Sequence, residues 1–239
     1  TELVQDRDRC FRIRELMKQL PDMEKLVGRL GIGRLNPRQA GAVRSGLIVA
    51  DAVAGNLRDC VSPHLMTLAK AFPETSPIGE RIEKALVEEP PLTAQKGNVI
   101  RRGFSKDLDE LNDSIHEARE YIGSLQKTER ERTGIATLKV GFNQVFGYYI
   151  EITRANAPSA PPEYIRKQTL VNAERYITPE LKKKEELILA AEEKISRLEL
   201  ALYQELVDFL AESIGTLACV AELLSEIDVV TALADLAVE

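Results

Sequence analysis

Two stretches of this chain, residues 105–132 and 178–212, carry apolar residues at helical spacing and constrain its fold most strongly. Their apolar residues recur at intervals of three or four, a narrow seam suited to packing against one partner helix. Because the two stretches flank an insert, we expect an antiparallel helix pair that carries this insert at one end. The first seam comprises Leu108, Leu111, Ile115, Ala118, Ile122 and Leu125, and the second comprises Leu187, Ala191, Ile195, Leu198, Leu202, Leu206 and Phe209.

Beyond Leu125 the first seam stops, because residues 126–133 are all polar or charged. A helix over the first stretch would extend roughly 40 Å at about 1.5 Å per residue. We therefore expect its far end to leave the shared core and run in water. The returning helix should begin after Thr178, a favourable N-cap, with Pro179 at its first position.

The rest of the chain outside the insert also predicts helices with polar caps. Asp22 is placed to cap one helix, and Asn36 followed by Pro37 opens another. A break at two prolines precedes residues 97–104, which indicate a strand or an extended connector. The expected division is a helical core over residues 1–104, a first long helix over 105–132, a β-rich insert over 133–177, a returning helix over 178–212 and a helical continuation over 213–239.

The insert is rich in aromatic and β-branched residues. Its first half favours a β-hairpin whose strands join through Asn143 and Gln144. Residues 164–177 indicate a further strand followed by a turn or a short helix. A sheet this small needs a cluster of large side chains to be stable. We expect that cluster to be private to the insert and to include Phe142, Tyr148, Ile150 and Ile152.

Residues that commonly perform catalysis or bind metals are few and scattered. His64 and His116 form no catalytic or metal-binding motif with their sequence neighbours, and the three cysteines lack metal-ligand spacing. Gly31 and Gly33 lack the Gly-Lys-Ser/Thr of a phosphate loop and favour a helix end. We therefore expect no active site, cofactor or metal in this chain. The scattered cysteines and the absence of a long apolar run favour a reducing, cytoplasmic location without a membrane span.

Charge is distributed unevenly along the chain, whose total is −6. Between Thr137 and Lys184, eight basic and four acidic side chains leave a net charge of +4, so the remainder is strongly acidic. A basic insert on an acidic body is what contact with a phosphate backbone requires. A solvated basic surface explains the same pattern, and charge alone does not separate the two interpretations.

Two long stretches of the chain resemble the MutS family of DNA mismatch repair proteins. They read ERERTGIATLKVGFNQVFGYYIEITRAN at residues 129–156 and YIRKQTLVNAERYITPELKKKEELILAAEEKI at residues 164–195. The flanking residues 22–39, 90–111 and 221–237 resemble the family's core and the roots of its lever helices. The resemblance therefore covers nearly the whole chain.

The resemblance implies a mainly α fold with a small β insert: a helical core, two long antiparallel lever helices and a small antiparallel β clamp at their tip. In this family, two such arms of a homodimer close around double-stranded DNA and touch its backbone without reading sequence. The lever couples this contact to an ATPase, so ATP and Mg²⁺ would belong to the parent protein, a DNA-dependent ATPase in the nucleoid. MutL is a candidate partner. The chain resembles an excised middle piece, without the family's mismatch-reading wedge domain and without its Walker-type ATPase domain.

The same resemblance suggests which side chains contact the DNA backbone. Asn172 has a structural alternative as a turn residue, and Arg175 has one as the ion-pair partner of Glu174 or Glu180. Relatives commonly carry lysine where this chain has Val171, so one phosphate contact is expected to be absent or displaced. The lysines at 182–184 favour a solvated helix face. In order of preference, the expected contacts are Asn172, then Arg154 and Asn156, then Arg166, Lys167 and Gln168, with Arg175 completing the set.

Two functions from different classes fit the sequence. The first is a clamp arm that binds duplex DNA without sequence specificity, in the context of a full-length dimer. The second is a structural helical arm whose tip docks a protein partner. The second function requires an apolar patch on the tip to be exposed rather than buried.

Overall fold

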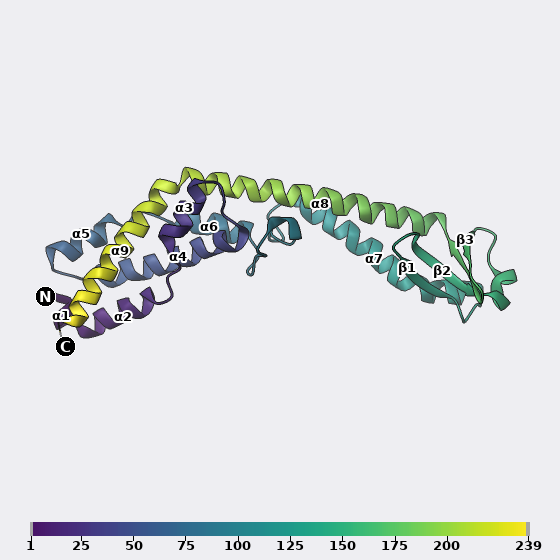
Figure 1. Cartoon of the computed structure of the whole chain (residues 1–239), viewed down its shortest axis with the longest axis horizontal. Coiled ribbons are helices and arrows are strands. Elements are labelled where there is room, and N and C mark those ends of the chain that lie inside the picture. Colours follow the sequence, from purple (N-terminus) through teal and green to yellow (C-terminus); the bar gives the residue numbers. More distant parts are fainter. Residues whose placement is uncertain (1, 238–239) are drawn as a thin grey trace. The chain divides into compact units, whose positions relative to one another are not determined.

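The computed structural model describes residues 2–237, which form two compact units (Figure 1). The first unit contains residues 2–104 and 199–237, and the second contains residues 105–198. Helix α8, Pro179–Glu212, contributes its first part to the second unit and its last part to the first. The chain is mainly helical with one small antiparallel sheet, which confirms the fold class expected from the sequence.

The first unit is built from helices around an apolar core. Helices α4 and α9 supply fully buried side chains to this core, among them Val53 and Leu57 from α4 and Leu217 and Leu224 from α9. Besides the end of α8, its elements are α1 Glu2–Gln5, α2 Arg7–Met17, α3 Met23–Gly31, α4 Pro37–Leu57, α5 Pro63–Ala71, α6 Ser76–Ala85, the 3-10 helix η1 Ala94–Lys96 and α9 Ile214–Leu236.

The helix starts expected from polar caps are confirmed. The Asp22 carboxylate accepts a hydrogen bond from the backbone N–H of Lys25 at 3.0 Å. Asn36 and Gln39 form a reciprocal capping box at the start of α4, with bonds of 2.9 and 3.1 Å. At the start of α8, the Thr178 hydroxyl accepts from the N–H of Leu181 at 3.1 Å. These bonds satisfy backbone donors that have no partner within their own helix.

The second unit places a four-stranded antiparallel sheet beside α7, Lys106–Thr133, and the first part of α8 (Figure 1). The spatial order of the strands is β1-β2-β4-β3. The predicted hairpin is confirmed, because Asn143 at the end of β1 pairs with Gly147 at the start of β2. The strands are β1 Lys139–Asn143, β2 Gly147–Thr153, β3 Ile165–Thr169 and β4 Ala173–Ile177, and the 3-10 helix η2 Arg154–Ser159 follows β2.

The strand and the turn predicted within residues 164–177 are confirmed as β3 and the turn at Asn172, but the prediction missed a second strand, β4, after that turn. This strand pairs with β2 on one side and with β3 on the other, so it is held by partners distant in sequence. On edge strand β3 the register shifts between Arg166 and Gln168, which leaves Lys167 as the extra residue of a β-bulge.

The core of the second unit is shared between sheet and helices, so the expectation of a core private to the insert was wrong. Ile150 and Ile152 are fully buried, as expected, but Phe142 is 59% exposed and Tyr148 is only partly buried. The inner face of the sheet packs against the seam of α7 and against Leu181 and Ile188 of α8, which lie outside the seam predicted for the second helix. Four strands cannot bury their own inner face. The cluster comprises Ala118, Ile122, Leu125, Ile135, Leu138, Ile150, Ile152, Tyr164, Tyr176, Leu181 and Ile188.

The last turns of α7 contact the insert, contrary to the expectation that they run in water. The Tyr164 hydroxyl donates to the Glu129 carboxylate at 2.6 Å, and the Arg130 guanidinium donates to the carbonyl of Leu138 at 2.6 Å. Arg132 forms ion pairs with Glu129 and with Glu163. Polar contacts therefore continue the packing of α7 beyond the end of its apolar seam.

Two side chains from the helices satisfy backbone amides of the hairpin. Glu185 of α8 accepts a hydrogen bond from the N–H of Tyr148 at 3.1 Å and lies directly against Gly147. Gln126 of α7 accepts from the N–H of Val140, on edge strand β1, at 3.1 Å. The hairpin is thus attached to both long helices by polar bonds as well as by its apolar face.

Candidate nucleic-acid interface

Three of the predicted contact residues gather at one end of the sheet, where β2 passes into η2 and β3 turns into β4. The backbone N–H of Arg154 donates to the carbonyl of Asn172 at 3.0 Å, so the two residues are neighbours. The Asn156 side chain donates to the Thr137 hydroxyl at 2.9 Å. We had expected Asn172 to follow the last strand of the sheet, but it lies before that strand, β4. It is exposed at the turn between β3 and β4.

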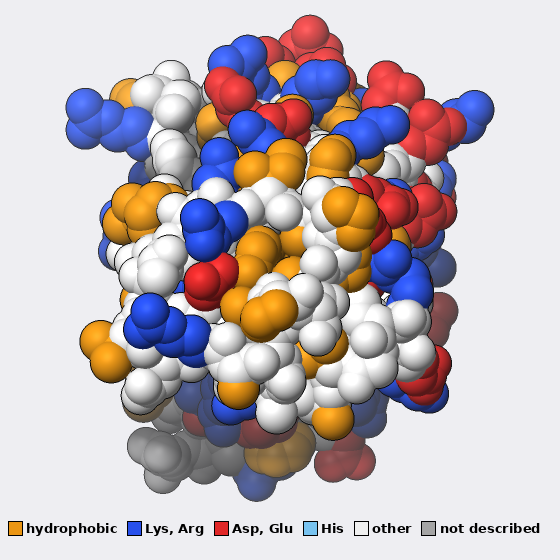
Figure 2. All heavy atoms as spheres, turned by 90° about the vertical axis from the view of Figure 1, so that its right-hand side faces the viewer, with side chains coloured by type: hydrophobic (Ala, Val, Ile, Leu, Met, Phe, Trp, Pro, Cys, Tyr) orange, Lys and Arg blue, Asp and Glu red, His pale blue; other side chains and the backbone are white. Residues whose placement is uncertain are grey.

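The side chains at this end are mostly neutral or basic. Figure 2 faces this end of the molecule and shows hydrophobic side chains near its centre, with basic and some acidic side chains around them. Arg154 and Lys167 are exposed, and neither forms an ion pair with any residue that the structure describes. Both side chains can therefore reach an external anion, although the charge of Arg154 also acts on the Glu174 carboxylate.

Arg166 and Gln168, which flank Lys167 on β3, have partners within the unit. The Arg166 guanidinium lies 3.5 Å from the Glu174 carboxylate, and the Gln168 side chain accepts a hydrogen bond from Arg175 at 3.1 Å. Glu174 also accepts a hydrogen bond from the Tyr176 hydroxyl, which together with Arg166 and Arg154 lowers the pKa of this carboxyl group. Burial and the bond to Glu174 raise the pKa of Tyr176 to about 12, so this hydroxyl stays a donor at neutral pH.

Arg175 lies on the outer face of the sheet and is held by three partners. It forms an ion pair of 2.9 Å with Glu151, across from it on β2, so the predicted pairing with Glu174 or Glu180 was wrong. The guanidinium also donates to Gln168 and lies 4.2 Å from the centre of the Tyr149 ring. The Tyr149 ring in turn covers Gly141, where a Cβ atom would lie 2.8 Å from the ring. Arg175 would have to give up these contacts to reach a phosphate.

We expect Arg175→Ala to lower the free energy of unfolding of residues 105–198 by about 1–2 kcal/mol, because it removes a half-buried ion pair, a hydrogen bond and a ring contact. Lys167→Ala, at an exposed position that has no ion pair among residues 2–237, should change it by less than about 0.5 kcal/mol. Urea unfolding followed by tyrosine fluorescence measures both variants. Equal effects would contradict a structural role for Arg175.

The lysines at the start of α8 divide among three environments. Lys182 lies 3.8 Å from Glu186, Lys183 is exposed, and the Lys184 ammonium lies 5.5 Å from the centre of the Tyr121 ring. These placements agree with a solvated helix face. The sequence analysis gave no role to Thr137, whose hydroxyl forms hydrogen bonds with the Asn156 side chain and the Thr153 hydroxyl. The only sequence feature that could have indicated this role is the presence of a hydroxyl residue beside the hairpin.

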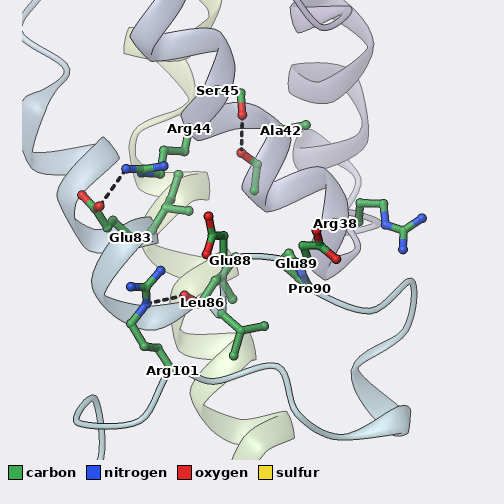
Figure 3. A pocket seen from close by; sticks show the side chains of 13 residues that line it. Arg38, Ala42, Arg44, Ser45, Glu83, Leu86, Glu88, Glu89, Pro90 and Arg101 are labelled. Carbon is green, nitrogen blue, oxygen red and sulfur yellow. Dashed lines mark hydrogen bonds and ion pairs between the residues drawn. The ribbon is translucent and has the colours of Figure 1, made fainter.

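A cleft in the first unit is lined mainly by α4, α6 and the segment that follows α6 (Figure 3). Arg44 forms an ion pair of 2.8 Å with Glu83, and Arg101 donates to the carbonyl of Leu86 at 2.9 Å. The cleft has a volume of about 660 Å³, and its lining contains neither histidine nor cysteine. Among residues 2–237 no group of three or more metal-binding side chains is found, and no helix is long and apolar enough to cross a membrane.

Comparison with known proteins gives consistent results over the whole chain. Residues 103–194 match the family model described as MutS family domain IV. All of this chain aligns with the DNA mismatch repair protein MutS of Halothermothrix orenii, at 41% identity. For the MutS proteins of Salinibacter ruber and Methanosarcina barkeri, 98% and 95% of this chain align, at 43% and 40% identity. The chain covers 27%, 26% and 26% of these proteins, so it spans about a quarter of their length.

Proposed function

Because the chain belongs to the MutS family, we propose that the end of its sheet contacts the sugar-phosphate backbone of duplex DNA without reading sequence. The observation that carries this proposal is the meeting of Arg154 and Asn172 at that end, with the exposed Lys167 on the neighbouring edge strand. Guanidinium, ammonium and amide groups are the usual donors to phosphate oxygens. Such contacts position a protein on DNA but carry no base information.

We further propose that the long helices transmit this contact to the rest of a longer protein. Helix α8 belongs to both units and is continuous over Pro179–Glu212. A continuous helix moves as a nearly rigid element, so a displacement at one end is passed along its length. In this proposal the receiver is an ATPase domain, with ATP and Mg²⁺, in the parent protein, which would act as a dimer. The ATPase domain and the dimer are proposed only from the resemblance of this chain to the MutS family.

The DNA contact is tested by the salt dependence of duplex binding in the full-length protein that carries this chain. We expect the double variant Arg154→Ala/Lys167→Ala to bind more weakly and to reduce the slope of log affinity against log salt by about 1.8, roughly 0.9 for each phosphate that is no longer neutralised. The weakening should be the same for duplexes of unrelated sequence. Lys194→Ala, which removes one exposed charge further along α8, serves as the control and should leave the slope unchanged.

A second candidate function is supported by exposed apolar side chains in the same unit. Val171, at the turn beside Asn172, is 83% exposed, and Ile165, at the opposite end of β3, is 49% exposed. Exposed apolar side chains contribute to protein-docking surfaces, and Val171 lies beside the predicted DNA contacts. Hydrogen exchange separates the two functions: DNA should protect the amides near Arg154 and Asn172. If DNA leaves them unchanged and a protein partner protects them, the docking function replaces the DNA contact.

A further inference from the structure

Glu199 of α8 is the one charged side chain that is buried among residues 2–237. It is 3% exposed and forms no ion pair with any described residue. A buried carboxylate without a cation is costly unless hydrogen-bond donors replace its water. The three donors that do so are consecutive backbone amides of the connector between η1 and α7.

The carboxylate accepts one hydrogen bond from each of these three amides. One oxygen, Oε2, accepts from the N–H of Asn98 at 2.9 Å, and Oε1 accepts from the N–H of Val99 at 3.0 Å and of Ile100 at 3.4 Å. Successive amides that converge on one point form a concave site for an anion, often called a nest. Gly97 and Asn98 adopt positive φ angles of 72° and 57°, which turn the chain so that these amides converge.

The local sequence suits this conformation. Glycine adopts positive φ without strain, and asparagine tolerates the left-handed region better than most residues. Gly97 also leaves room for the ligand, because a Cβ atom there would lie 3.2 Å from Oε2 of Glu199. A larger residue at position 97 would therefore strain the backbone and would also crowd the Glu199 carboxylate.

The connector is fixed independently of Glu199. The N–H of Val87 donates to the carbonyl of Val99 at 3.1 Å, and the N–H of Arg101 donates to the carbonyl of Ala85 at 2.8 Å. Leu86 and Ile100 form a β-bridge between the same segments. These bonds leave the amides of residues 98–100 facing Glu199, so the site is shaped before the carboxylate binds.

We infer that the amides of residues 98–100 form a preorganised anion-binding site whose ligand is the carboxylate of Glu199. The chemical class of ligand is a small carboxylate, because two oxygens separated by one carbon match the three amides. These hydrogen bonds join the last part of α8 to the connector, and both belong to the first unit. Glu199 is thus a positioning residue for this connector.

The test replaces the tethered carboxylate by a free one. In Glu199→Gly, amide exchange at residues 98–100 should accelerate about tenfold or more, because three donors lose their acceptor. Sodium formate should restore most of the protection, and sodium chloride at equal ionic strength should not. The matched control is Glu205→Gly, which places the same substitution at an exposed position of α8 and should respond to neither salt.

A second variant covers the case in which Glu199→Gly does not fold. Glu199→Gln keeps the shape of the side chain but replaces one acceptor oxygen by an NH₂ donor, so at least one of the three amides must lose its bond. We expect that amide to exchange at least about tenfold faster. Wild-type exchange rates at all three amides in this variant, or equal effects of formate and chloride in Glu199→Gly, would overturn the inference.

Discussion

Replacing Gly147 by alanine should lower the free energy of unfolding of residues 105–198 by about 2–4 kcal/mol. Gly147 opens strand β2 with a φ angle of 74°, a conformation that costs a residue with a Cβ atom about 1–3 kcal/mol. An added Cβ would also overlap Oε1 of Glu185. The Glu185 side chain must then move and release the N–H of Tyr148.

The measurement is urea unfolding followed by tyrosine fluorescence. The chain has no tryptophan and six tyrosines, and all of these except Tyr203 lie within residues 105–198, so the signal reports mainly on this unit. Gly123→Ala is the matched control: Gly123 lies in α7 with nothing within 4 Å of an added Cβ, and this variant should gain about 0.5–1 kcal/mol.

A double-mutant cycle separates the two causes of the destabilisation in Gly147→Ala. With Glu185→Ala in the background, the steric conflict is gone, and only the cost of the backbone conformation should remain. The destabilisation caused by Gly147→Ala should therefore be smaller in that background. An effect of the same size in both backgrounds would show that the contact with Glu185 contributes nothing.

Ile150→Ala should cost about 2–5 kcal/mol of unfolding free energy, whereas Phe142→Ala should cost less than about 1 kcal/mol. Ile150 is fully buried between the sheet and the long helices, and its truncation leaves a cavity. Phe142 is larger but largely exposed, with an edge-on ring contact to Tyr148 at 5.0 Å.

The same unfolding measurement compares these two variants directly. Residue size alone would predict the opposite order, because phenylalanine buries more area than isoleucine when both lie in a core. A larger destabilisation by Phe142→Ala than by Ile150→Ala would therefore contradict the shared core and restore a cluster private to the insert.

Helical parts of this fold were predictable because their signals are local. The seam from Leu108 to Leu125 follows the period of one helix, and the caps at Asp22 and Asn36 act within three residues. Each signal concerns neighbours in the sequence, so long-range packing has little influence on it.

The sheet was less predictable because its strands depend on distant partners. Strand β4 exists through its pairing with β2 and β3, and nothing within residues 173–177 alone distinguishes a strand from a short helix. The predicted burial of Phe142 was wrong for the same reason, since the cover over the sheet comes from α7 and α8. Alternation along β2 did identify Ile150 and Ile152 as the buried face.

The DNA contacts of the candidate site stay a prediction, and only the placement of their residues can be compared with the structure. The resemblance and the charge pattern selected Arg154, Asn156 and Asn172, and these three residues lie at one end of the sheet. The partner of Arg175 could not be predicted, because the cross-strand register places Glu151 opposite it. Register depends on the whole sheet, so an ion pair of this kind is not visible from sequence spacing.

Open sheet edges invite strands from other molecules and so favour aggregation. In this sheet the Val140 amide on β1 is already occupied by Gln126, and the bulge at Lys167 places an irregular, charged residue on β3. Both outer strands therefore resist cross-molecular pairing. We expect this protection to limit association between copies of the chain, even though Phe142, Val145 and Phe146 are exposed beside an edge.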